Sequence, residues 1–209
     1  MSSLRIARAV LVVLAVALWP TAARPSPDRV IVVLGDSLTA GLGVAVDEAY
    51  PALLESRLRR GGFPYRVVNA GVSGDTSAGG LRRLDWVLRS KPEIVVVALG
   101  ANDGLRGAPV AALRDNLLAI VTRARAAGAR VLLAGMRLPP NYGNAYAGAF
   151  ADTFREVARQ TSTPFLPFLL DGVAGDPALN QPDGIHPNAA GQRIVAQHVW
   201  AALEPLLRR

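Results

Sequence analysis

The chain has 209 residues, which suits one ordinary domain with a full hydrophobic core. Hydrophobic residues make up 51% and charged residues 19%, and this composition excludes a disordered chain. The absence of cysteine excludes disulfides, thiolate metal sites and a cysteine nucleophile, and two histidines are too few for a multi-histidine metal site. The net charge is +7, but no basic run is longer than two residues and no aromatic residues interleave with the basic ones, so we expect no nucleic-acid partner.

The start of the chain has the layout of a secretory signal peptide. Arg5 and Arg8 form a short basic stretch, residues 9–19 are an unbroken apolar run, and small residues follow up to Ala23. The apolar run is shorter than the about 20 residues that a membrane span needs. We therefore expect cleavage after Ala23, a globular domain at residues 24–209, and export to the periplasm or the medium. An uncleaved N-terminal anchor is the alternative.

Beyond this segment, short apolar runs alternate with amphipathic stretches. A continuous aliphatic run predicts a strand that is buried on both faces at residues 30–34, and a second uniformly apolar run predicts a strand at residues 94–99. Further strands are predicted at residues 66–69, at residues 131–134 and from residue 165 onward. Apolar residues at helical spacing predict helices at residues 47–60, 81–88, 110–121 (closed by Gly128), 145–160 and 188–203. This alternation predicts an open, doubly wound α/β sandwich with a parallel five-stranded sheet, in which ligands bind beyond the carboxyl ends of the strands.

Polar residues directly follow the first three predicted strands. Asp36 and Ser37 come after the first strand, a glycine-rich loop that starts near Gly71 follows the second, and Asn102 follows the third. A hydroxyl, a backbone N–H made accessible by glycine and an amide side chain could serve one reaction at this edge of the sheet. Each feature also has a plain structural alternative: a helix N-cap for Asp36 or Ser37, an ordinary turn for the loop, and an Asx turn for Asn102.

A short loop before the last helix supplies a carboxylate and an imidazole. Asp183 and His186 stand three residues apart, and a carboxylate at this distance can accept a hydrogen bond from Nδ1–H of the imidazole. The Nε2 atom of His186 would then be free to act as a base. A solvent-exposed loop histidine is the alternative. His198 lies on the apolar side of the last helix, and we interpret it as structural.

Taken together, these parts predict acyl transfer through an acyl-enzyme, because they include a hydroxyl nucleophile, donors for an oxyanion, and a base with its orienting group. The same residues resemble the GDSL, or SGNH, hydrolases. The matching blocks are Gly35-Asp36-Ser37-Leu38, then Gly71, then Gly100-Ala101-Asn102-Asp103, then Asp183-Gly184-Ile185-His186-Pro187-Asn188. The resemblance covers residues 29–203 and implies a three-layer α/β/α sandwich of the flavodoxin-like type. Ala101 stands where the family usually has glycine, a small change that we expect to be tolerated.

The stretch from Arg137 to Gly143 is similar to the bacterial periplasmic thioesterase/lysophospholipase and arylesterase subfamily. The resemblance implies that Ser37 is the nucleophile, that His186 is the general base and then the acid, and that Asp183 orients His186. It also implies an oxyanion hole made by the N–H groups of Ser37 and Gly71 and the side chain of Asn102. No metal or organic cofactor is implied.

The favoured function is an exported serine esterase acting on small-molecule acyl esters, thioesters or lysophospholipids, with transient contact with a membrane surface. A carbohydrate O-deacetylase with the same machinery and a non-catalytic binding protein on this fold are the alternatives. We expect a monomer, because no apolar stripe on the predicted helices exceeds what the core needs.

Overall fold

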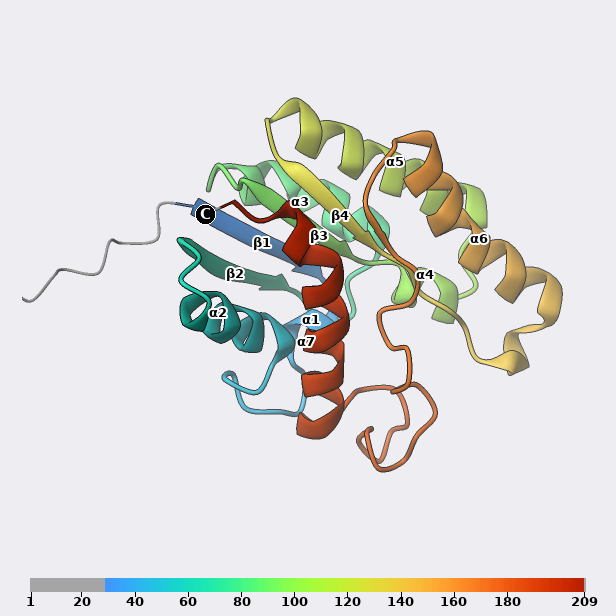
Figure 1. The fold of residues 1–209 in the computed structure, drawn as a ribbon. Coiled ribbons are helices and arrows are strands. Elements are labelled where there is room, and N and C mark those ends of the chain that lie inside the picture. The colour runs from blue at the N-terminus through green and yellow to red at the C-terminus, as the bar shows by residue number, and fades with distance from the viewer. Residues whose placement is uncertain (1–28, 209) are drawn as a thin grey trace, which may run out of the picture.

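Five parallel strands form the centre of the computed structural model, which describes residues 29–208 (Figure 1). The strands are β1 (Arg29–Gly35), β2 (Tyr65–Gly71), β3 (Ile94–Ala98), β4 (Arg130–Ala134) and β5 (Phe165–Leu166). They follow the order β2-β1-β3-β4-β5 across the sheet. The predicted α/β sandwich with an open five-stranded parallel sheet is therefore confirmed. The expected signal peptide lies outside the described residues.

Helices cover both faces of the sheet (Figure 1). On one face, α2 (Tyr50–Arg60) packs against α7 (Ala189–Leu203). On the other face, α3 (Ser77–Leu88), α5 (Val110–Ala126) and α6 (Asn144–Gln160) pack in sequence. The shorter elements are α1 (Ser37–Ala40), α4 (Ala101–Leu105), η1 (Pro140–Tyr142) and η2 (Glu204–Leu206). No helix among residues 29–208 is both long and apolar enough to cross a membrane.

The burial of each strand follows from its place in the sheet. Every residue of β3 is buried, and only the first residue of β1 and of β4 is partly exposed, because neighbouring strands and both helix layers enclose these central strands. Strand β2 lies at an edge, and exposed residues interrupt its apolar run. The continuous aliphatic runs that predicted fully buried strands thus correspond to the middle of the sheet.

The predicted helix at residues 47–60 begins later than expected, at Tyr50. The residues before it form a turn, and Ala49 is extended with φ −64° and ψ 140°. Pro51 fits this start, since proline lacks an N–H and is favoured in the first turn of a helix, where that group has no partner within the helix. The two short helices α1 and α4 were not predicted as elements, and both lie directly after strands at the carboxyl edge.

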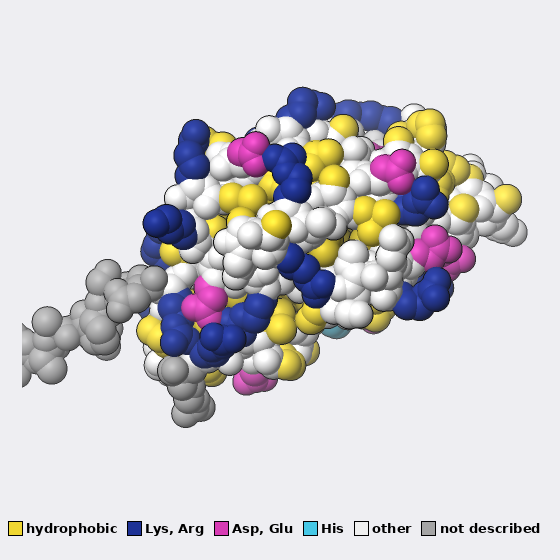
Figure 2. All heavy atoms as spheres, turned by 90° about the horizontal axis from the view of Figure 1, so that it is seen from above, with side chains coloured by type: hydrophobic (Ala, Val, Ile, Leu, Met, Phe, Trp, Pro, Cys, Tyr) yellow, Lys and Arg dark blue, Asp and Glu magenta, His cyan; other side chains and the backbone are white. Residues whose placement is uncertain are grey.

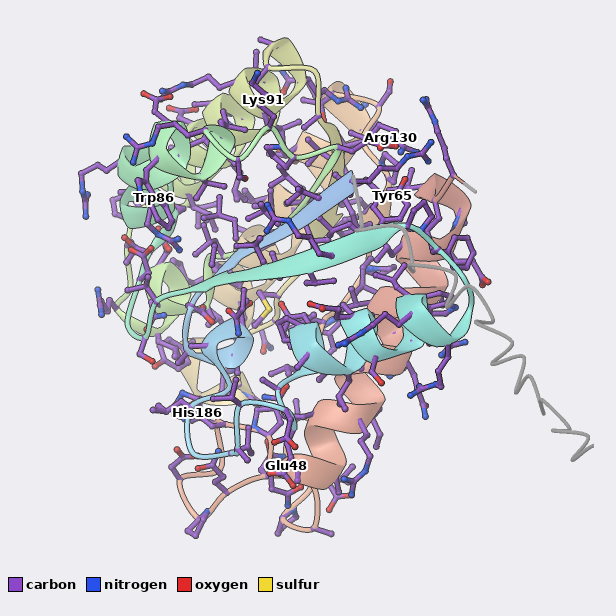
Figure 3. All side chains as sticks on the ribbon, turned by 90° about the vertical axis from the view of Figure 1, so that its left-hand side faces the viewer. Glu48, Tyr65, Trp86, Lys91, Arg130 and His186 are labelled. Atoms are coloured by element: carbon purple, nitrogen blue, oxygen red, sulfur yellow. The ribbon has the colours of Figure 1, made fainter. Side chains whose placement is uncertain are left out.

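Different side chains lie at the two ends of the sheet (Figure 3). Tyr65 and Arg130 lie at the amino ends of the strands, where both contact the carboxylate of Glu93. His186 lies at the opposite end, beyond the carboxyl ends of the strands.

Basic side chains are scattered over the face drawn in Figure 2, with acidic side chains between them.

Candidate active site

Ser37 lies at the carboxyl edge of the sheet because β1 ends one step before it. Gly35 closes β1, Asp36 caps the following helix, and Ser37 is the first residue of α1. The Asp36 carboxylate accepts a hydrogen bond from the N–H of Leu38 at 3.0 Å. Asp36 is therefore the N-cap of α1, the structural role given above as an alternative, and Ser37 next to it still lines the cleft. The Ser37 side chain is largely buried, with 8% of the residue exposed, and it lines a cleft.

The side chains of Ser37, His186 and Asp183 form a continuous chain of hydrogen bonds. Ser37 Oγ lies 2.8 Å from His186 Nε2, and His186 Nδ1 lies 2.7 Å from an oxygen of Asp183. The N–H groups of Ile185 and His186 donate to the other oxygen of Asp183. These backbone bonds, followed by the imidazole, lower the pKa of Asp183 to about 2.

The charge on Asp183 fixes the tautomer of the imidazole. An ionised carboxylate can only accept hydrogen bonds, so Nδ1 of His186 carries the proton. The lone pair of Nε2 then faces the Ser37 hydroxyl and can accept its proton. The structure thus brings Ser37, His186 and Asp183 together in the predicted geometry.

The loop that carries His186 is tied to α7 and to the segment after α1. Gln181 donates from its side chain to the carbonyl groups of Leu42 and Pro187, and its backbone N–H donates to the carbonyl of His186. Asn188 caps α7 by accepting from the first N–H groups of that helix. These bonds hold the loop against the helix that starts at Ser37.

The structure does not bring Gly71 to this site. Its N–H donates to the side-chain oxygen of Asn69 at 2.9 Å, and Gly71 does not line the cleft. A Cβ atom at this position would lie 2.2 Å from the backbone nitrogen of Ala40. Gly71 is therefore small because α1 packs directly against the end of β2. Its N–H is already bonded and the residue is not part of the cleft wall, so the structure does not place it as the predicted oxyanion donor.

Gly74 occupies the place expected for Gly71. It lines the cleft, and its φ of +78° is one that side-chain-bearing residues rarely adopt. Among residues 29–208, its N–H has no hydrogen-bond partner, whereas the next N–H, that of Asp75, bonds to the carbonyl of Val72. The signal in the sequence was the turn Ser73-Gly74-Asp75-Thr76, in which the glycine is nearer to the following helix.

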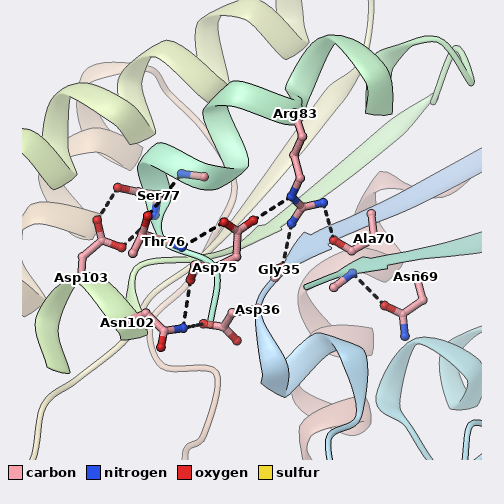
Figure 4. Close-up of polar contacts among 12 residues, drawn as sticks. Gly35, Asp36, Asn69, Ala70, Asp75, Thr76, Ser77, Arg83, Asn102 and Asp103 are labelled. Atoms are coloured by element: carbon pink, nitrogen blue, oxygen red, sulfur yellow. Dashed lines mark hydrogen bonds and ion pairs between the residues drawn. The ribbon is translucent and has the colours of Figure 1, made fainter. Parts of the chain in front are cut away.

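Asn102 projects into the same region from the first turn of α4. Its amide nitrogen donates to the carbonyl of Asp75 at 2.9 Å and lies 3.4 Å from the Asp36 carboxylate (Figure 4). The first bond is a good one and fixes the amide. The second is long and therefore weak, so a ligand oxygen can compete for that N–H at little cost. The N–H of Ser37 itself has no partner in the described part of the chain.

A buried carboxylate lies beneath these donors. Asp36 is 1% exposed, and this burial raises the pKa of its carboxyl to about 6, against the lowering effects of the Leu38 N–H and of His186. Asp36 is therefore a second acid beside the predicted site residues, and it is buried in addition to capping α1.

The cleft around Ser37 has a volume of about 690 Å³ and is mostly apolar. Its apolar walls include Leu38, Leu105, Met136, Leu138, Phe168 and Leu170. The basic side chain in the wall is Arg137, whose guanidinium lies 5.0 Å from the ring centroid of Phe168.

Within residues 29–208, no group of three or more acidic or histidine side chains is arranged to hold a metal ion. His198 does not line the cleft, and its Nε2 atom is buried without a partner among the described residues.

Comparisons with known proteins show which family this chain resembles. The model of the GDSL-like lipase/acylhydrolase family matches residues 33–194. The chain is 49% identical to the esterase TesA of Pseudomonas aeruginosa over 180 residues, which cover 86% of this chain and 90% of that protein. It is 40% identical over 185 residues to thioesterase 1/protease 1/lysophospholipase L1 of Escherichia coli K12, which covers 88% of each chain.

A crystal structure of TesA superposes on this chain with a TM-score of 0.84 and 49% sequence identity, and the match covers 86% of this chain and 100% of that chain. The family match spans most of the described residues, and it includes the strand ends that carry Ser37 and Asn102 and the loop that carries His186. The protein therefore belongs to the GDSL-like lipase/acylhydrolase family of carboxylic ester hydrolases.

Proposed function

We propose that this protein is an exported serine esterase that hydrolyses acyl esters, thioesters or lysophospholipids through an acyl-enzyme. The observation that carries the proposal is the hydrogen-bonded chain Ser37–His186–Asp183, of which Ser37 and His186 line an apolar cleft. In the first step, His186 Nε2 takes the proton as Ser37 Oγ attacks the acyl carbonyl. The protonated imidazole then gives this proton to the leaving alcohol or thiol.

The oxyanion formed by this attack needs donors close to Ser37. The N–H groups of Ser37 and Gly74 and the amide of Asn102 are the groups suited to the role, because all three residues line the cleft. Gly74 here replaces the expected Gly71. In the second step, His186 takes a proton from water, the hydroxide attacks the acyl–Ser37 ester, and the carboxylic acid and the Ser37 hydroxyl are released.

The cleft favours a substrate with an extended apolar acyl chain. A volume of about 690 Å³ with a mostly apolar wall far exceeds what an acetyl group fills. This argues against a carbohydrate O-deacetylase, which uses the same machinery on an acetyl ester. Arg137 adds one positive charge to the wall, which suits the phosphate of a lysophospholipid.

Export and membrane contact are part of the proposal. The basic and apolar start of the chain supports a signal peptide at residues 1–23. Leu42 and Ile185 line the cleft and are 46% and 47% exposed, so they could touch a lipid surface while a substrate enters. The monomeric state and the lack of a nucleic-acid partner stay predictions.

The test compares the wild type with Ser37→Ala on nitrophenyl esters from acetate to palmitate. We expect activity in the wild type with an optimum beyond acetate, no activity in Ser37→Ala, and labelling of the wild type alone by a serine-directed phosphonate. Equal hydrolysis by both proteins would remove Ser37 from its role, and an acetate optimum with rejection of longer chains would favour the deacetylase. A folded wild type that neither hydrolyses any ester nor reacts with the phosphonate would contradict the esterase as a whole.

A further inference from the structure

A single arginine joins the segments that carry the proposed oxyanion donors. Arg83, on α3, has a side chain that is 20% exposed, and three of its N–H groups are used. Its Nε donates to the carboxylate of Asp75 at 2.7 Å, Nη1 to the carbonyl of Ala70 at 2.7 Å, and Nη2 to the carbonyl of Gly35 at 2.8 Å (Figure 4). These are short, charge-assisted bonds from one rigid, planar group.

Each acceptor belongs to a different part of the site. Gly35 ends β1 two residues before Ser37, and Ala70 lies near the end of β2, where the loop to Gly74 begins. Asp75 follows Gly74 directly, and its backbone carbonyl is the acceptor that fixes the amide of Asn102. The guanidinium therefore ties together the segments that bear Ser37 and Gly74, and it reaches Asn102 indirectly through Asp75, although it touches none of the reacting atoms.

The other end of α3 fixes Asn102 from a second side. Asp103, the neighbour of Asn102 in α4, accepts hydrogen bonds from the N–H and the hydroxyl of Ser77 at 2.8 and 2.6 Å. Ser77 is the first residue of α3. Helix α3 thus holds α4 through Ser77 and holds the loop of Gly74 and Asp75 through Arg83, so one rigid element aligns both sides of the oxyanion hole.

We propose that Arg83 is a positioning residue for the oxyanion hole, which acts through Asp75 on Gly74 and Asn102. This inference rests on the proposed esterase function. The competing explanation is that Arg83 only satisfies two carbonyl groups at strand ends and so stabilises the fold. The two explanations predict different kinetics for the molecules of a variant that still fold. If Arg83 positions the donors, its replacement lowers kcat per folded molecule. If Arg83 only stabilises the fold, its replacement lowers the fraction of folded molecules and leaves their kcat unchanged.

The experiment measures kcat and KM for a nitrophenyl ester per active site, with sites counted by complete reaction with a serine-directed phosphonate. The variants are Arg83→Met, Arg83→Lys and Asp75→Asn, and Arg82→Met is the matched control because Arg82 is the adjacent exposed arginine of α3. We expect Arg83→Met to lower kcat per site about 10- to 100-fold with KM changed less than about threefold, since small misplacements of catalytic donors cost this much. Arg83→Lys and Asp75→Asn should fall between this variant and the wild type, and Arg82→Met should match the wild type.

A double-mutant cycle tests the route of the effect. If Arg83 acts through the donors, Arg83→Met should lower kcat by a clearly smaller factor in an Asn102→Ala background than in the wild type, because one of the two donors that it positions is already absent. An unchanged kcat per site in folded Arg83→Met, or equal losses in both backgrounds, would overturn the inference. If Arg83→Met does not fold, the same criteria apply to Arg83→Lys and Asp75→Asn. A wild type without ester hydrolysis would instead refute the proposed function, which the same assay reports separately.

Discussion

The buried carboxylate of Asp36 should make the stability of this protein depend on pH in an unusual direction. Most acids in folded proteins are stabilised as anions, but burial raises the pKa of Asp36 from 3.8 to about 6. Replacing it by asparagine removes the ionisation and keeps the size. The side-chain oxygen of asparagine can still accept the hydrogen bond that Leu38 N–H donates to Asp36.

The direction and the size of this pH effect on stability follow from the different pKa of Asp36 in the folded and the unfolded chain. Between pH 3.8 and about 6 the folded protein holds a proton on Asp36 that the unfolded chain has released, so this group's contribution to stability falls as the pH rises. Above about pH 6 the loss is complete. Each pKa unit corresponds to about 1.4 kcal/mol, so the wild type should lose about 2–3 kcal/mol relative to Asp36→Asn between about pH 4 and about pH 8. For a chain of this length that difference is roughly 5–10 °C in Tm.

The assay is thermal or denaturant unfolding of both proteins at the two pH values. At each pH, the free energy of unfolding of the wild type is subtracted from that of the variant, and the two differences are then compared. Any effect of the long contact between Asp36 and Asn102 that does not change with pH cancels in this comparison. Asp47→Asn, on an exposed loop, controls for the loss of one negative charge. A difference for Asp36→Asn that stays within about 0.5 kcal/mol between the two pH values would refute the assigned burial cost.

Three further outcomes follow from the geometry of the site. Asn102→Ala should lower kcat about 10²- to 10³-fold while the protein still folds, and an unchanged kcat in steady-state kinetics would remove Asn102 from the oxyanion hole. Asp183→Asn should lower kcat about 10²- to 10⁴-fold, since His186 would lose the acceptor that fixes its tautomer; full activity of a folded variant would contradict this role. Leu138→Trp should shorten the preferred acyl chain in the nitrophenyl ester series, because Leu138 lines the cleft, and an unchanged optimum would place the acyl chain elsewhere.

The central architecture was predictable because burial on both faces leaves a simple pattern. The runs at residues 30–34, 94–99 and 131–134 are apolar throughout, and the structure places them in β1, β3 and β4 at the middle of the sheet. The short helices α1 and α4 carry no such pattern. Each has fewer than two turns, so its formation depends on the strand before it and on packing at the edge of the sheet rather than on periodicity.

The triad and the oxyanion hole differ in how far sequence could locate them. Asp183 and His186 are close in the chain, so local geometry alone can join them, and only the contact of His186 with Ser37 needed the fold. The proposed glycine donor was harder to assign, because Gly71 ends β2, Gly74 follows three residues later, and both lack a side chain. What separates them is tertiary: α1 packs on Gly71, and Asn69 takes its N–H, whereas the positive φ of Gly74 turns that residue to the cleft.

The two halves of the site are supported by different kinds of structure. The side chain of Asp183 is 45% exposed, and most of the bonds that hold it and His186 come from neighbouring backbone groups of the same loop. The donor side is built from Asp36, Asp103 and Arg83, which are buried or nearly so and which connect β1, α3 and α4. The donors are therefore preorganised by the core itself, which electrostatic stabilisation of an oxyanion requires. The proposed base instead sits on a loop that is held mostly by its own backbone bonds, together with the bond from Gln181 to the carbonyl of Leu42.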